Sequence, residues 1–183
     1  MQREQAYEIL TRYTKSKNLV NHGLAVEGAM RHFASLCGAD EDYWGKIGML
    51  HDADYEMYPE EHLRHTEELL KPYGVSDAEI HAINSHGWGI CSDVEPVEHM
   101  EKVLFAVDEL TGLIVACALV TPDKKLAAVT TESVLKKWKK KDFARGANRE
   151  IISKGAEMLG MPLEELVSET LKGMQKIAGE IGL

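Results

Sequence analysis

Apolar residues recur along most of the chain at spacings of three and four, and no segment alternates convincingly with a period of two. The first spacing gathers apolar side chains on one face of an α-helix, whereas the second would indicate a β-strand. We therefore predict an all-α protein. The expected helices span roughly residues 3–15, 18–38, 40–51, 60–70, 76–87, 97–120, 131–140, 144–159 and 162–181.

Local signals support several of these helix boundaries. Ser76 and Glu79 have the spacing of a capping box, in which each side chain accepts a hydrogen bond from the other residue's backbone. Pro59 disfavours helix at the residue before it, so residues 54–59 are expected to form a loop. Pro162 suits the first turn of the last helix.

The organisation of the chain predicts a single domain over residues 1–183. No linker, low-complexity tract or internal repeat divides it, and its length suffices to bury a full hydrophobic core. The longest and most apolar predicted helix, 97–120, is expected to be central. Helices in 121–183 are expected to pack on the region of about 18–120.

Composition and charge narrow the class of function. The net charge of −9 disfavours general binding to nucleic acid or to anionic membranes. The best candidate for a membrane span, residues 113–120, is about half the length needed, and the N-terminus carries charge where a signal peptide would be apolar. Cys37, Cys91 and Cys117 are widely spaced and odd in number, which predicts reduced thiols and a cytoplasmic protein.

A pair of adjacent residues, His51-Asp52, points to a metal site. The pair ends a predicted helix that packs inward, where an imidazole and a carboxylate can both reach one cation. Taken alone the pair is common, and such pairs usually cap helices. However, Asp108 interrupts an apolar run, and a buried carboxylate is costly unless a cation or hydrogen-bond donors compensate it. His22, near the start of the second helix, is the remaining candidate ligand.

The order of these residues resembles the HD superfamily of metal-dependent phosphohydrolases. Its defining pattern is a His, a His-Asp pair and a distant Asp on separate helices, here His22, His51-Asp52 and Asp108. The surrounding stretches 21–27 and 105–110 also fit. The resemblance implies a helical bundle of the HD-domain type in which these four residues hold one divalent ion.

Some HD families add two histidines, which create a second metal site. This sequence offers His62 or His65, followed by His81 or His86. The residues around His62 and His86 match the family spacing better, so we predict these two as the ligands. Asp52 would then bridge two ions. His32 and His99 have no motif context and are expected at the surface or between helices.

The resemblance implies a small phosphorylated metabolite or nucleotide as substrate, attacked by water activated by one or two metal ions. Imidazole and carboxylate ligands suit Mn, Fe, Co, Ni, Zn or, less well, Mg. Asp52 and Asp54 are the predicted catalytic residues. Asp54 and Glu27 are candidates for a base or for orienting a ligand, although a solvated helix-end charge is the favoured interpretation of Glu27.

One departure from the family concerns positive charge. Many HD hydrolases carry a lysine soon after the His-Asp pair, whereas residues 53–56 here are Ala-Asp-Tyr-Glu. A highly anionic substrate would need its counter-charge from elsewhere. The basic residues after the helix that carries Asp108 either turn towards the site or lie in solvent; they are Lys124, Lys125, Lys136, Lys137, Arg145 and Arg149.

Aromatic residues near the predicted site also have two possible interpretations. Tyr55, Tyr58 and Trp88 either stack on a ring of the substrate or simply pack. Two other functions also stay open. Some HD-fold proteins are di-iron oxygenases, and others are non-catalytic sensors or adaptors, although the complete set of ligands argues against the latter. The oligomeric state is left open.

Overall fold

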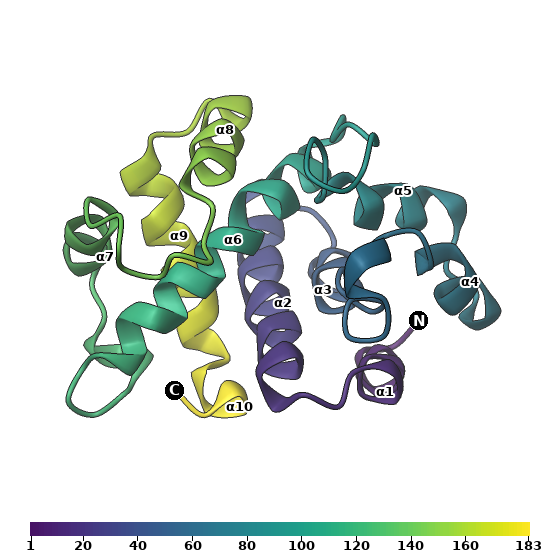
Figure 1. Cartoon of the computed structure of the whole chain (residues 1–183), viewed down its shortest axis with the longest axis horizontal. Coiled ribbons are helices and arrows are strands. Elements are labelled where there is room, and N and C mark those ends of the chain that lie inside the picture. The colour runs from purple at the N-terminus through teal and green to yellow at the C-terminus, as the bar shows by residue number, and fades with distance from the viewer.

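Two long helices, α2 (Lys17–Cys37) and α6 (His99–Leu119), lie against each other at the centre of the computed structural model, which describes residues 1–183 (Figure 1). All regular secondary structure is helical, which confirms the predicted all-α class. The helices α3, α4 and α5 lie on one side of this central pair, and α7, α8 and α9 lie on the other. The remaining α-helices are α1 (Arg3–Tyr13), α3 (Glu41–Leu50), α4 (Thr66–Leu70), α5 (Asp77–Ser85), α7 (Thr131–Trp138), α8 (Arg149–Leu159), α9 (Leu163–Lys176) and α10 (Ala178–Ile181), with short 3-10 helices at Pro59–Glu61, Lys71–Tyr73 and Leu126–Ala128.

One hydrophobic cluster of 43 buried residues extends from Ala6 to Ile181. The helix α6 is buried on most sides, as its apolar sequence predicts. At its crossing with α8 the two backbones approach closely, because a Cβ added at Gly155 would lie 2.6 Å from the Cα of Ala106. The C-terminal helices therefore pack on the region that carries the predicted ligands. No helix has both the length and the apolar character that crossing a membrane requires.

Several predicted helix ends are confirmed. The Asp40 side chain caps α3 by accepting a hydrogen bond from the Tyr43 backbone N–H. Ser76 and Glu79 form the expected capping box at the start of α5. These ends depend on side chains within one turn of the helix, so they are readable from sequence.

The continuous helix predicted over 60–70 is wrong. A 3-10 turn, Pro59–Glu61, is followed by irregular backbone, and helix resumes only at Thr66. Leu63 has a φ of +69°, which a helix does not accommodate. The Asp54 carboxylate holds this conformation because it accepts a hydrogen bond of 2.7 Å from the Leu63 backbone N–H.

The predicted beginning of the eighth helix at residue 144 is also wrong. Ala144 has a φ of +47°, and α8 begins at Arg149 after Asn148, whose side chain accepts hydrogen bonds from the backbone N–H groups of Glu150 and Ile151. The last predicted helix is divided in two, since α9 ends at Lys176 and α10 follows. The irregular segment before α8 borders the cleft described below.

Candidate metal centre

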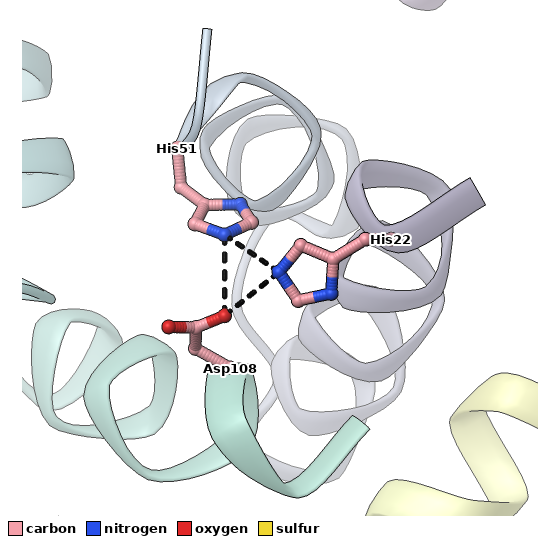
Figure 2. Close-up of side chains that lie close together, drawn as sticks. All are labelled: His22, His51 and Asp108. Carbon is pink, nitrogen blue, oxygen red and sulfur yellow. Dashed lines mark hydrogen bonds and ion pairs between the residues drawn. The ribbon is translucent and has the colours of Figure 1, made fainter. Parts of the chain in front are cut away.

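Three predicted ligands from separate helices meet in one cluster (Figure 2). His22 lies in the second turn of α2, His51 directly follows α3, and Asp108 lies on α6. The Nε2 atom of His22 is 2.9 Å from Oδ1 of Asp108 and 3.2 Å from Nε2 of His51. The Nε2 atom of His51 is 3.2 Å from the same Asp108 oxygen. Three atoms from distant parts of the sequence thus converge on one point.

Asp52 joins this group to a second one. Its Oδ2 atom lies 3.5 Å from Nε2 of His22 and 3.4 Å from Nε2 of His51. Its Oδ1 atom lies 3.2 Å from Nε2 of His62 and 3.4 Å from Nε2 of His86. The Nε2 atoms of His62 and His86 are 3.2 Å apart. The two oxygens of one carboxylate therefore face two separate sets of imidazoles.

Backbone carbonyls determine which nitrogen two of the histidines present to the cluster. The Nδ1 atom of His51 lies 2.7 Å from the Gly48 carbonyl oxygen, and that of His86 lies 2.7 Å from the Ile83 carbonyl oxygen. A carbonyl can only accept, so Nδ1 carries the proton in both residues. In the neutral imidazole, Nε2 is then left with a free lone pair directed at the cluster.

Side chains orient the other two histidines in the same way. The Nδ1 atom of His62 donates to Oδ1 of the buried Asp54 over 2.8 Å. The Thr111 hydroxyl donates to the Asp108 carbonyl oxygen, so it can accept from Nδ1 of His22, 3.4 Å away. All four imidazoles thus direct Nε2 towards the carboxylates of Asp52 and Asp108.

The mutual contacts of these groups shift their pKa values strongly. Burial alone raises the pKa of Asp52 and of Asp108, but the charge of His51 and the hydrogen bonds from the imidazoles outweigh it and hold both pKa values below the usual range. Burial lowers the pKa of His51, whereas the charges of Asp52 and Asp108 raise it well above normal. Hydrogen bonds to Asp52 and Asp54 outweigh burial and raise the pKa of His62 to about 9. The cluster therefore attracts positive charge.

The donor set fits divalent metal ions. Ligand nitrogens and oxygens at roughly 2.1 Å from one ion lie about 3.0–3.4 Å from each other in octahedral or tetrahedral coordination. The separations of 2.9–3.5 Å around Asp108 and Asp52 fall close to this range. Two Nε2 atoms 3.2 Å apart repel each other if both are unprotonated, so each pair needs either a shared proton or a metal cation between its two nitrogens. Imidazole and carboxylate together suit transition metals better than Ca²⁺ or Mg²⁺.

The cluster forms the floor of an open cleft of about 600 Å³. His51 is wholly buried beneath it, whereas the side chains of His22 and Asp52 are 24% and 18% exposed and line it. Tyr55 stands at the cleft with its ring edge-on to His62, 5.1 Å between centroids. Tyr58 and Trp88 are not part of the lining.

The four other histidines have partners outside the cluster. The structure thus brings His62 and His86 together and leaves His65 and His81 apart. His32 contacts Glu169 between α2 and α9, His65 stacks on Tyr58, His81 pairs with Glu101, and His99 packs on Trp44.

Asp54 and Glu27 are not placed to act as a base. The Asp54 side chain is wholly buried and accepts hydrogen bonds from His62 and Leu63, so it orients His62, a predicted ligand, and does not line the cleft. The interpretation of Glu27 as a solvated charge is wrong. Its carboxylate is buried and held by Arg3, at 2.6 and 2.9 Å, and by Arg31, at 2.8 Å.

The C-terminal basic residues do not line the cleft. The Arg149 guanidinium donates to backbone carbonyls, among them that of Phe143 at 2.6 Å, and Arg145 pairs with Asp142. These contacts organise the segment before α8. The sequence interpretation also missed Thr111, although its position one turn after Asp108 on the same helix face could have indicated a role.

No protein-family model matches the sequence, and no solved structure matches the chain.

Proposed function

We propose that the protein is an HD-type, metal-dependent phosphohydrolase that acts on a small phosphorylated compound. The observation that carries the proposal is Asp52, whose two carboxylate oxygens each face a separate set of imidazole Nε2 atoms at 3.2–3.5 Å. Such an arrangement suits a carboxylate that bridges two ions. Adjacent pairs of ions are a recurrent solution for displacement at phosphorus.

The ligands divide into two sets that share Asp52. One set would hold a first ion through three further residues, and the other would hold a second ion through two. The first comprises His22, His51 and Asp108, and the second comprises His62 and His86. Ions bound there would lower the pKa of a coordinated water and offset charge on the phosphoryl oxygens.

The residues of the chain contribute orientation and a partly dry environment. The Nδ1 contacts to Gly48, Ile83, Asp54 and Thr111 keep each Nε2 directed at the cluster. Such contacts from outside the ligand set typically change metal affinity 10–100-fold when they are removed. In the reaction, the water oxygen forms a bond to phosphorus and the ester P–O bond breaks. One proton of the water passes to the leaving oxygen.

A di-iron oxygenase is the second candidate function. It is favoured by the presence of both additional histidines and by the lack of lysine or arginine in the cleft lining. A non-catalytic adaptor role is less consistent with an accessible cleft that is lined by five of the six convergent candidate ligands, with His51 directly beneath it.

Elemental analysis of protein purified without chelator tests the proposal. We expect about two ions per wild-type chain and about one in the variant His62→Ala/His86→Ala. The matched control is His65→Ala/His81→Ala, which removes two histidines outside the cluster and should retain both ions. Release of inorganic phosphate from a panel of phosphate esters should follow the ion content.

The identity of the metal and the activity separate the alternatives. Iron together with substrate-dependent oxygen consumption, and no phosphate release, would favour the oxygenase. A wild-type protein that takes up no metal even after reconstitution would refute both enzymatic proposals.

A further inference from the structure

The cleft extends beyond the metal cluster along one face of α6. Gly112 and Ala116 follow Asp108 at intervals of four residues, and all three line the cleft. At 1.5 Å per residue they lie about 6 and 12 Å further along the helix axis. A substrate whose phosphoryl group lies at Asp108 would thus extend over these two small residues.

Other residues that line the cleft are also small or apolar. They include Ala144, Gly146 and Ala147 from the segment before α8, and Ile151 on α8. Tyr55 and Ile90 also line the cleft, and they are 40% and 58% exposed although both are large apolar residues. A space of about 600 Å³ with such walls is typical of a site for a small molecule with an apolar part.

The charges of the cleft are acidic throughout. Apart from the histidines and the Tyr55 phenol, its ionisable lining groups are Asp52, Asp108, Glu109 and the Cys91 thiol. Burial raises the pKa of that thiol, which keeps it neutral. The carboxylates offset most of the charge that two divalent ions would bring. Little positive charge is then left for a triphosphate or a dinucleoside polyphosphate.

We infer that the substrate of the proposed phosphohydrolase is a phosphate monoester whose alcohol part is a compact apolar or aromatic group lying over Gly112 and Ala116. This inference rests on the proposed function, and it excludes nucleoside polyphosphates as preferred substrates. Hydrolysis releases inorganic phosphate and the apolar alcohol, with water as the only co-reactant.

Binding of phosphonates, which contain a C–P bond that hydrolysis of esters does not cleave, tests the inference without relying on turnover. The probes are phenylphosphonate, methylphosphonate and methylenebisphosphonate, titrated by calorimetry into manganese-loaded wild-type protein. We expect phenylphosphonate to bind at least tenfold more tightly than methylphosphonate, and the bisphosphonate to bind less tightly than phenylphosphonate.

A substitution at Gly112 locates the apolar part. A Cβ at Gly112 would meet no atom within 4 Å and Gly112 lines the cleft, so we expect Gly112→Leu to fold and to place its side chain in the cleft. Gly179 is equally unobstructed and lies on α10, away from the cleft, so Gly179→Leu is the matched control. We expect Gly112→Leu to abolish the preference for phenylphosphonate and to leave methylphosphonate affinity within threefold. The control should retain the preference.

The outcomes distinguish this inference from the proposed function. Equal affinity for the two monophosphonates, tighter binding of the bisphosphonate, or an unchanged preference in Gly112→Leu would overturn the inference and leave the phosphohydrolase standing. If no phosphonate binds to protein that contains both ions, both are overturned. Melting curves of each variant without metal verify that it is folded.

Discussion

The buried carboxylate of Asp54 offers the sharpest test of how the second ligand set is organised. It accepts hydrogen bonds from Nδ1 of His62 over 2.8 Å and from the backbone N–H of Leu63 over 2.7 Å. In Asp54→Asn, the amide has one oxygen to offer two donors. Either one donor stays unsatisfied, or His62 changes tautomer and places a proton on Nε2, the atom that would bind metal.

The two contacts of Asp54 lead us to expect an effect both on stability and on metal affinity. An unsatisfied buried donor costs about 1–3 kcal/mol, so the metal-free variant should unfold at a lower denaturant concentration by a corresponding amount. Loss of an orienting carboxylate should weaken the second ion about 10–100-fold. The first ion should be affected much less, because Asp54 contacts none of His22, His51 and Asp108.

The assay is calorimetric titration of Mn²⁺ into metal-free protein, in which we expect two binding steps. Thr111→Val is the matched control, since it removes the hydroxyl 3.4 Å from Nδ1 of His22 and keeps the shape of the side chain. Because this contact is longer, its loss should lower the affinity for the first ion less than about tenfold, and it should leave the affinity for the second ion unchanged. If Asp54→Asn weakened both ions equally, or neither, the assignment of Asp54 to His62 would be refuted.

Three further predictions concern stability. Glu27→Ala should lower the free energy of unfolding by about 2–4 kcal/mol. Breaking a fully buried ion pair costs roughly 3–5 kcal/mol, and the loss here should be smaller because both arginine partners of Glu27 are partly exposed to solvent. Denaturation should show this while metal content stays unchanged, and a loss below about 1 kcal/mol would contradict it. Gly155→Ala should lower the free energy of unfolding by about 1–3 kcal/mol, because its Cβ would collide with α6. Gly112→Ala should raise it by about 0.5–1 kcal/mol, because a Cβ there meets no other atom. Similar melting temperatures for the two variants would contradict the close approach of α8 to α6. In metal-free protein, the pKa of His62 is raised from 6.5 to about 9. The contribution of protonated His62 to stability is therefore complete below pH 6.5 and is lost as the pH rises through 9. Thermal unfolding in chelator should show this decline, and a melting temperature that stays constant over this pH range would contradict the prediction. Metal-loaded protein should instead gain stability as the pH rises through the acidic range, because protons leave the Nε2 atoms that bind the metal.

The number and approximate extent of the helices were largely predictable, because amphipathic periodicity and capping residues act within a few turns. Asp40 at α3 and Ser76 with Glu79 at α5 are such cases. The segment 60–70 was not predictable. Its backbone at Leu63 is held by Asp54, nine positions earlier, and this contact overrides local helix preference.

Part of the metal cluster was likewise predictable from the sequence, and part was not. The order of His22, His51-Asp52 and Asp108 was sufficient to propose a site by resemblance, and the structure brings these residues together. The choice of His62 over His65 came from motif spacing alone. The reason is tertiary, since Asp54 turns His62 inward while His65 stacks on Tyr58.

The helical class, the order of the candidate ligands and the acidic character of the chain could be read from the amino-acid sequence, because these depend on residue type and short-range spacing. The pairing of charges between distant residues came from the packing of the helices. Glu27 pairs with Arg31 one turn along α2, but its burial depends on Arg3, 24 positions away on α1. The packing also leaves no lysine or arginine side chain in the cleft lining, which away from the candidate ligands consists mostly of small and apolar residues. Pairing between distant residues depends on how the helices pack, and residue type alone does not specify it.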